Sequence, residues 1–190
     1  MSLGPLIVVS GPAGSGKSTL IEMALGEFGP RLRHSVSATT RAPRKGELDG
    51  IHYHFWTRDR FEAGIAAGEF LEYATVFGKD YYGTPRSEVD QYRKQGMAVV
   101  LDIDVQGASQ LRRTCPDAYT IFLRTPPGEF ERRLRERGTE TEEAIQRRLA
   151  EARVELSRAA EFDRVILNDN LDRAAAELCD IIRSRLSAMP

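Results

Sequence analysis

A glycine-rich segment near the start of the chain carries the residues with the clearest chemical meaning. Residues 11–18 fit the pattern G-x-x-x-x-G-K-[ST] of phosphate-binding loops. Backbone N–H groups of such a loop surround a phosphate, and the positive end of the following helix points at the same place. The pattern predicts that Lys17 bridges the β- and γ-phosphates of ATP and that Ser18 binds Mg²⁺. The predicted ATP-binding residues of this segment are Gly11, Pro12, Ala13, Gly14, Ser15, Gly16, Lys17, Ser18 and Thr19.

Two carboxylates follow a second apolar run. Asp102 ends the run 97–102, and Asp104 comes two residues later. Ligands of parallel α/β sheets bind at the carboxyl ends of the strands, so we expect Asp102 to hold Mg²⁺ through a water molecule. The alternative for both carboxylates is that they cap the next helix. A GTPase would need a guanine-reading N-K-x-D segment, and the nearest match, 168–170, lacks the lysine.

These residues need strands and helices to position them. Short apolar runs rich in β-branched residues predict buried strands, and the segments between them have helical composition. Alternating strands and helices predict an α/β fold, in which a parallel sheet is flanked by helices on both faces. The predicted strands are 6–10, 97–102, 118–123 and 165–167, and the predicted helices are about 18–28, 86–95, 106–113, 127–137, 142–160 and 171–187.

The segment 34–84 differs from the rest of the chain. It is rich in Thr, Tyr, His, Arg and Gly, and it contains short alternating runs such as 51–55. This composition predicts a small mixed or antiparallel lobe inserted into the α/β core. Its high content of polar residues predicts that it lines a binding site. The core would then comprise residues 1–33 and 85–190.

The chain resembles the guanylate kinases of bacterial type, and the resemblance covers nearly its whole length. Together the matching segments are far more specific than the phosphate loop, which many NTPases share. They are residues 10–19, 35–47, 50–55, 81–84, 101–107 and 137–141. The resemblance implies a core of the P-loop NTPase type, a GMP-binding lobe at 34–84 and a helical lid at about 134–150. His52 departs from the aspartate expected in many relatives, and we assign it no role.

The resemblance also implies a GMP site built by the inserted lobe. Two arginine forks three residues apart, in a loop stiffened by Pro43, are suited to grip a phosphate dianion, and tyrosine hydroxyls can complete its shell. Two solvated arginines are the alternative reading. The residues that match the family's phosphate binders are Arg41, Arg44, Tyr53 and Tyr82, and those that match positions facing the guanine are Ser37, Glu72, Thr84 and Asp104.

Glu72 would explain the choice of base. The Watson–Crick edge of guanine offers two adjacent donors, N1–H and the 2-amino group, and an ionised carboxylate can accept both bonds. Adenine has a lone pair at N1 and no 2-amino group, so it would leave the carboxylate unpaired. A site of this kind can discriminate by about 10⁴-fold. The alternative is that Glu72 is a surface charge at the edge of a strand.

Residues 127–158 are crowded with Arg and Glu. For most of them, a solvated helix pair with i,i+4 bridges such as Glu131–Arg135 is a sufficient explanation. Three arginines match family positions that reach the ATP and the transferred phosphoryl group, where cations act electrostatically. Asn168 matches a contact to the adenine edge, and use in an ordinary turn is the alternative. The catalytic set implied by the resemblance is Lys17, Arg41, Arg133, Arg137 and Arg148.

Composition limits the other classes of function. The chain has 190 residues, with 27 Lys and Arg against 28 Asp and Glu, which argues against a general nucleic-acid binder. No apolar run approaches the roughly 20 residues of a membrane span, and no secretory signal is recognisable. The two cysteines lack metal-type spacing and predict ordinary thiols in a reducing cytoplasm.

The sequence therefore predicts an enzyme that moves the γ-phosphoryl group of MgATP onto GMP, and onto dGMP. Its partners are the nucleotides, with neither nucleic acid nor membrane, and the pattern leaves monomer and homo-oligomer open. Two alternatives remain. One is a kinase of the same fold for another small phosphorylated acceptor, and the other is a guanylate-kinase-like interaction module without catalysis.

Overall fold

The computed structural model describes residues 3–76, 79–126, 128–136 and 141–189, without the side chains of Val76, Arg133, Leu134, Glu136 and Ala144. Within these residues, the strands are β1 (Leu6–Ser10), β2 (Leu32–His34), β3 (Ala38–Thr39), β4 (His54–Phe55), β5 (Phe70–Val76), β6 (Asp80–Pro85), β7 (Ala98–Asp102), β8 (Tyr119–Arg124) and β9 (Arg164–Leu167). The α-helices are α1 (Lys17–Phe28), α2 (Arg58–Ala66), α3 (Arg86–Arg93), α4 (Val105–Thr114), α5 (Glu129–Glu136), α6 (Glu142–Ser157) and α7 (Leu171–Ser187).

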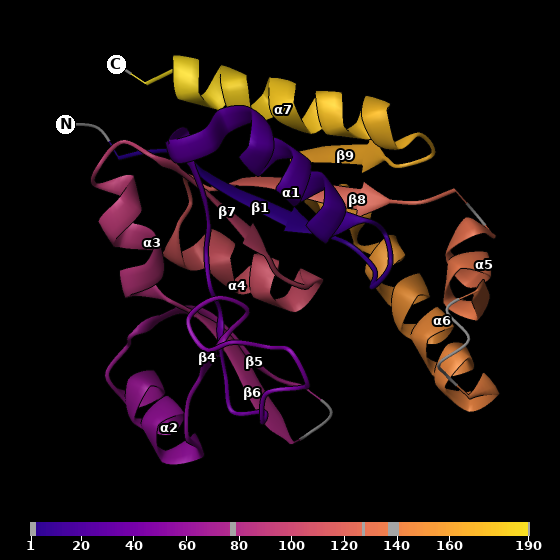
Figure 1. Cartoon of the computed structure of the whole chain (residues 1–190), viewed down its shortest axis with the longest axis horizontal. Helices are drawn as coiled ribbons and strands as arrows, with labels where there is room; N and C mark the ends of the chain where they lie inside the picture. Colours follow the sequence, from indigo (N-terminus) through magenta and orange to yellow (C-terminus); the bar gives the residue numbers. More distant parts are fainter. Residues whose placement is uncertain (1–2, 77–78, 127, 137–140, 190) are drawn as a thin grey trace.

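The larger sheet is parallel throughout and has the strand order β2-β7-β1-β8-β9 (Figure 1). Four of its strands confirm, to within one residue at each end, the strands predicted from the apolar runs. The strand β2 was not predicted, because Leu32-Arg33-His34 is only three residues long and contains a single apolar residue. It pairs with β7 at one edge of the sheet, so His34 is a residue of the larger sheet.

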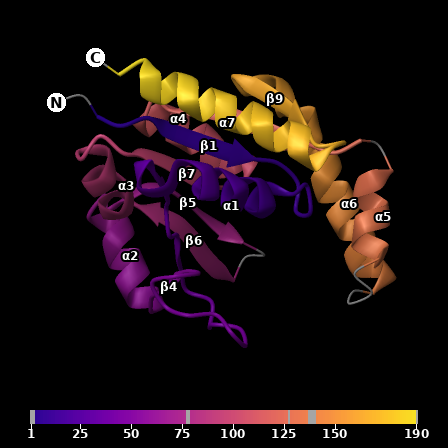
Figure 2. The same ribbon diagram turned by 45° about the horizontal axis from the view of Figure 1, so that its top comes forward.

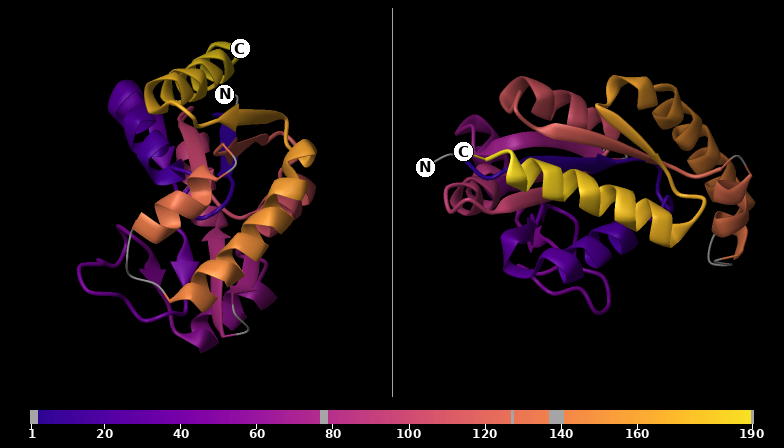
Figure 3. Two further views of the ribbon diagram at one scale, coloured as in Figure 1. Left: turned by 90° about the vertical axis from the view of Figure 1, so that its right-hand side faces the viewer. Right: turned by 90° about the horizontal axis from the view of Figure 1, so that it is seen from above.

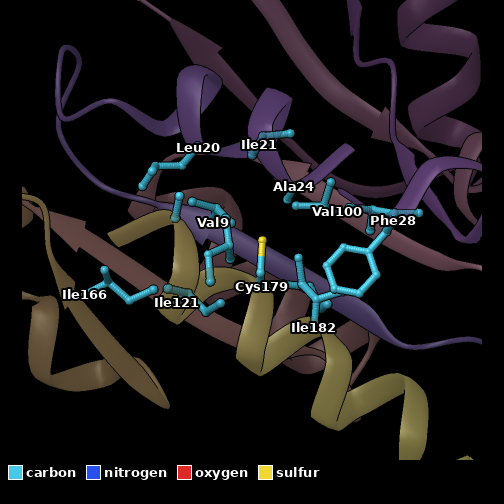
Figure 4. Close-up of a cluster of buried hydrophobic side chains, with 14 of the residues drawn as sticks. Val9, Leu20, Ile21, Ala24, Phe28, Val100, Ile121, Ile166, Cys179 and Ile182 are labelled. Carbon is cyan, nitrogen blue, oxygen red and sulfur yellow. The ribbon is translucent and has the colours of Figure 1, made fainter. Parts of the chain in front are cut away.

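Helices cover both faces of this sheet, which explains why its central strands β1 and β7 are apolar on both sides. Ile7 and Val9 of β1 pack in one cluster with α1 and α7, as Figure 4 shows for Val9. Leu6 and Val8 point to the other face and pack with residues of α3 and α4. Figure 3 shows the same layering from two further sides. The central strand is therefore completely buried, and the loop that follows it starts from a rigid base.

All six predicted helices are present in the described residues and in the predicted order, but some of their ends differ. The predicted helix 142–160 ends at Ser157, whose hydroxyl donates to the carbonyl of Val154 at 2.7 Å and competes with the helical pattern. The predicted helix 127–137 begins only at Glu129, after Gly128, which has a φ of 82°. The predicted helix 86–95 ends at Arg93.

The inserted segment forms a smaller mixed sheet with the order β4-β3-β6-β5, in agreement with the predicted mixed lobe. The alternating run 51–55 contributes only the two-residue strand β4. The helix α2, which was not predicted, begins where Thr57 accepts a hydrogen bond from the N–H of Arg60. Phe61 of this helix packs with Phe70 and Ala38 in a small core of its own.

The two sheets meet through α4, which packs against β5 (Figures 1 and 2). Leu71 of β5 is buried in the same cluster as Leu111 of α4 and Val89 of α3. The helices α5 and α6 lie side by side at the end of the molecule towards which β1 points (Figure 1). The division into a core at 1–33 and 85–190, a lobe at 34–84 and a lid at about 134–150 stays a prediction. Among the described residues, no helix is long and apolar enough to span a bilayer.

Candidate functional site

The phosphate loop lies between the end of β1 and the start of α1, as the motif requires. The side chain of Lys17 lies over the loop. Its Nζ donates hydrogen bonds to the carbonyl of Gly11 at 2.7 Å and to that of Pro12 at 3.3 Å. Gly16 has a φ of 96°, and a Cβ at this position would lie 2.5 Å from the amide nitrogen of Asn168. Asn168 therefore packs closely against the loop at Gly16. Ser18, in the first turn of α1, is exposed to solvent.

Asn168 supports this loop. It follows β9, the residue is 3% exposed, and its Nδ2 donates to the carbonyl of Ser15 at 2.8 Å. Sequence reasoning offered an adenine contact or an ordinary turn for this residue and missed the contact to the loop. That contact joins residues that are far apart in the sequence, so no local pattern could have indicated it. The adenine contact stays a prediction.

The two aspartates after β7 have different surroundings. Asp104 is the N-cap of α4, because its carboxylate accepts a hydrogen bond from the N–H of Gly107 at 2.8 Å. The capping alternative thus holds for Asp104. It does not hold for Asp102, whose Oδ1 lies 3.8 Å from the Nζ of Lys17. The carboxylate of Asp102 is therefore next to the phosphate loop, where its predicted role requires it.

A cavity of about 180 Å³ opens beside these aspartates. Its lining includes five of the eight residues predicted for GMP, four from the inserted segment and Asp104 from the N-cap of α4. The lining residues are Ser37, Tyr53, Glu72, Ala74, Tyr82, Gly83, Asp102, Ile103 and Asp104. Of the remaining three, Thr84 and Arg41 contact lining residues, whereas the exposed Arg44 does not line the cavity.

Glu72 is a buried residue of this lining. It is 6% exposed, it pairs with Thr84 across β5 and β6, and its Oε1 accepts a hydrogen bond from the Thr84 hydroxyl at 2.6 Å. Burial raises the pKa of its carboxyl from 4.5 to about 7, although the bond from Thr84 acts in the opposite direction. The burial excludes the alternative of a surface charge at a strand edge.

The raised pKa of Glu72 predicts a pH-dependent stability. The folded protein holds a proton that the unfolded chain has lost between pH 4.5 and about 7, so the free energy of unfolding falls as pH rises through this window. The loss amounts to at most about 3 kcal/mol. Urea unfolding of the wild type and of Glu72→Gln checks this: the variant lacks the carboxyl, so above about pH 7 it is expected to be the more stable protein. Parallel pH profiles of the two proteins would contradict it.

The Arg41 guanidinium is held by a residue that sequence reasoning missed. It donates to both carboxylate oxygens of Glu47, at 2.8 and 3.0 Å, and its Nε donates to the hydroxyl of Tyr82 at 3.0 Å. Glu47 also accepts from the N–H of Arg44 at 2.6 Å, and its contact with Arg41 lowers the pKa of Glu47 to about 2. An acidic residue six positions after Arg41 was the available signal. Arg41 thus already binds an anionic group in the geometry that suits a phosphate.

The arginine-rich helices α5 and α6 lie next to the phosphate loop. Arg148 of α6 lines a cavity of about 120 Å³ together with Ala13 of the loop and Glu155. Arg137 and the side chain of Arg133 lie outside the described residues, so their roles stay predictions. The bridge predicted between Glu131 and Arg135 is present, and Arg135 also pairs with Glu142. For Arg135, the interpretation as part of a solvated helix pair is therefore confirmed.

Comparisons with known proteins agree with this geometry. Residues 4–185 match the sequence profile of the family described as guanylate kinase. A guanylate kinase of Rubrobacter xylanophilus is 50% identical over 96% of this chain and 95% of its own length. One of Vibrio parahaemolyticus is 48% identical over 97% and 89%, respectively.

A crystal structure of guanylate kinase from Anaplasma phagocytophilum superposes with a TM-score of 0.75 at 32% identity, over 98% of this chain and 88% of that one. The match in sequence and the match in structure thus both extend from the phosphate loop through the inserted lobe to α7. With the profile spanning nearly the whole sequence, the chain belongs to the guanylate kinase family.

Proposed function

We propose that two facing groups of side chains in this protein carry out the transfer of the γ-phosphoryl group from ATP to GMP. The chain is an ATP:GMP phosphotransferase, in line with its family and its full-length relatives. In the proposal, Lys17 and the phosphate loop hold the β- and γ-phosphates of ATP. Arg41, Arg44 and the two tyrosines hold the phosphate of GMP, and Glu72 and its neighbours bind the guanine. None of these groups is assigned to the ribose 2′-hydroxyl, so dGMP is expected to serve as well.

The observation that carries this proposal is the position of Asp102. Its carboxylate lies 3.8 Å from the Nζ of Lys17, and the same residue lines the cavity that contains Glu72 and Tyr82. One side chain thus faces both the phosphate loop and the cavity of the inserted lobe. This supports an arrangement in which the two nucleotides meet end to end.

The chemistry of the transfer requires positioning and charge neutralisation. A phosphate oxygen of GMP is already anionic near neutral pH and attacks the γ-phosphorus without a general base. The bond from the γ-phosphorus to the β,γ-bridging oxygen breaks, and the products are GDP and ADP. The described residues that line the two cavities include no histidine or cysteine, which fits this requirement. Lys17 and Arg148 would stabilise the charge on the transferred group, with Arg133 and Arg137 added by the lid.

The oxygen atoms available beside the loop fit Mg²⁺. The hydroxyl of Ser18 and the carboxylate of Asp102 are hard ligands, and the Asp102 side chain is 24% exposed next to the loop. The described residues contain no group of three His, Cys, Asp or Glu that could hold a metal by themselves. The ion would therefore bind mainly to the phosphates of ATP and neutralise part of their charge, with Ser18 and Asp102 completing its shell.

Asp102→Asn tests the metal assignment. The amide removes the negative charge beside Lys17 but keeps the size of the side chain, so we expect the Mg²⁺ concentration for half-maximal rate to rise by about 10-fold. The measurement is ADP release with GMP at a fixed ATP concentration and increasing Mg²⁺. Asp172→Asn, an exposed position in the first turn of α7, is the matched control. An unchanged Mg²⁺ requirement in Asp102→Asn would exclude Asp102 from the metal site.

The alternatives find less support. A kinase for an acceptor without a guanine base would not require the buried carboxylate of Glu72, which is held by Thr84 near Asp104. A module without catalysis does not need Lys17, Ser18 and Asp102, which are all present. The two cysteines are buried and free, and they support the proposed reducing cytoplasmic environment.

A further inference from the structure

Gly107 lies in the first turn of α4, directly against the carboxylate of Glu72. A Cβ built on Gly107 would lie 2.7 Å from Oε2 of Glu72 and 3.2 Å from its Cδ. The first distance is shorter than any ordinary contact of a Cβ, so no other residue type fits here while Glu72 keeps its position. On its other side, Glu72 is held by the hydroxyl of Thr84 at 2.6 Å. The carboxylate is thus fixed between Thr84 and the bare backbone of α4.

The backbone of Gly107 also fixes the second carboxylate of the cavity. Its N–H donates to Oδ1 of Asp104 at 2.8 Å. The conformation of Gly107 is helical and needs no glycine for the sake of φ, because it is not among the glycines with positive φ. Glycine costs helical stability at such a position compared with alanine. A built Cβ would also lie 3.4 Å from the Cβ of Ile103, which is an ordinary contact, so the close approach of Glu72 gives the reason for the residue type.

We propose that Gly107 is a positioning residue for base selectivity, whose missing side chain holds open the place in which the Glu72 carboxylate faces the guanine. This inference rests on the proposed role of Glu72. A methyl group on α4 would displace the carboxylate, since the helix backbone is held by its own hydrogen bonds and Glu72 is the group that can rotate. The bonds to N1–H and the 2-amino group of guanine would then be lost or misaligned, whereas adenine has no such bonds to lose.

Gly107→Ala is the test, and Gly26→Ala is its matched control. Gly26 lies inside α1, is exposed, and has no atom within 4 Å of a built Cβ. For Gly107→Ala, kcat/KM with GMP is expected to fall by about 10- to 100-fold, with kcat/KM for AMP changed by less than about 3-fold. Gly26→Ala is expected to leave both values unchanged.

A double-mutant cycle separates this role from a structural one. If Gly107 acts through Glu72, adding Gly107→Ala to Glu72→Gln causes much less additional loss with GMP than it causes in the wild type. An equal loss in both backgrounds would overturn the inference, as would full GMP selectivity in Gly107→Ala. In the latter case, a loss of selectivity in Glu72→Gln alone would leave the proposed role of Glu72 intact.

A stability measurement covers the case in which Gly107→Ala folds poorly. The side chain of aspartate is one methylene shorter, so Glu72→Asp combined with Gly107→Ala relieves the contact. The double variant is therefore expected to recover the Tm lost in Gly107→Ala. No recovery would mean that the added methyl group conflicts with something other than Glu72, and it would overturn the inference.

Discussion

Lys17→Ala is expected to lower kcat by about 10²- to 10³-fold or more, because it removes a positive charge next to the transferred phosphoryl group. The ammonium group lies over the phosphate loop, bonded to the carbonyl of Gly11 at 2.7 Å, so it is already placed where a triphosphate would enter. Among the amino acids, lysine carries its positive charge on a compact ammonium group, and alanine at this position provides no charge. Steady-state ADP release with saturating ATP and GMP measures the effect.

The fold of Lys17→Ala should survive, because the loop is also fixed by Asn168 and by the burial of β1. A far-UV circular dichroism spectrum and a thermal melt check this. Lys94→Ala, an exposed lysine after α3, controls for the loss of one positive charge. Turnover of Lys17→Ala within about 3-fold of the wild type would refute the assignment of the loop to ATP, given the loss expected for one missing stabilising group.

Glu72→Gln is expected to lower kcat/KM with GMP by about 10²- to 10³-fold while changing the value with AMP far less. The glutamine amide has the shape of the carboxyl, but its NH₂ group is a hydrogen-bond donor. This donor would face a donor of guanine, so a repulsion replaces one of the two hydrogen bonds. Glu72 is only 6% exposed, so water can replace a lost hydrogen bond only poorly, which makes the mismatch costly. The comparison of GMP with AMP, CMP and UMP in an ADP-release assay gives the selectivity.

Glu69→Gln is the matched control for this substitution. Glu69 precedes β5 in the same lobe and forms an exposed ion pair with Arg60, so its loss should leave selectivity unchanged. Selectivity that survives in Glu72→Gln would remove Glu72 from base recognition. In combination with the stability profile, the expected result is a variant that folds better above about pH 7 and selects its base worse, as is common for buried functional groups.

The sequence by itself determined the parts of this protein that depend on local patterns. A buried parallel strand is apolar on both faces, so β1, β7 and β8 could be recognised from their residues alone. The apolar run 165–167 also indicated β9, although only Ile166 of that strand is buried. The phosphate loop is a contiguous motif whose glycines and lysine are all visible in one segment. The family resemblance added the eight residues assigned to GMP, and the structure gathers five of them around one cavity.

Only the tertiary structure decided which partners hold these residues. Contacts between Glu72 and Thr84, and between Gly107 and Glu72, arise from pairing of β5 with β6 and from packing of α4, which no local periodicity encodes. The strand β2 escaped prediction because an edge strand of three residues gains its stability from the neighbouring β7. The support of the loop by Asn168 belongs to the same class, because the fold brings the residue after β9 next to Ser15, 153 positions away in the sequence. The chemistry that depends on residue type could thus be predicted from the sequence. The burial of these side chains and their contacts with distant residues could not.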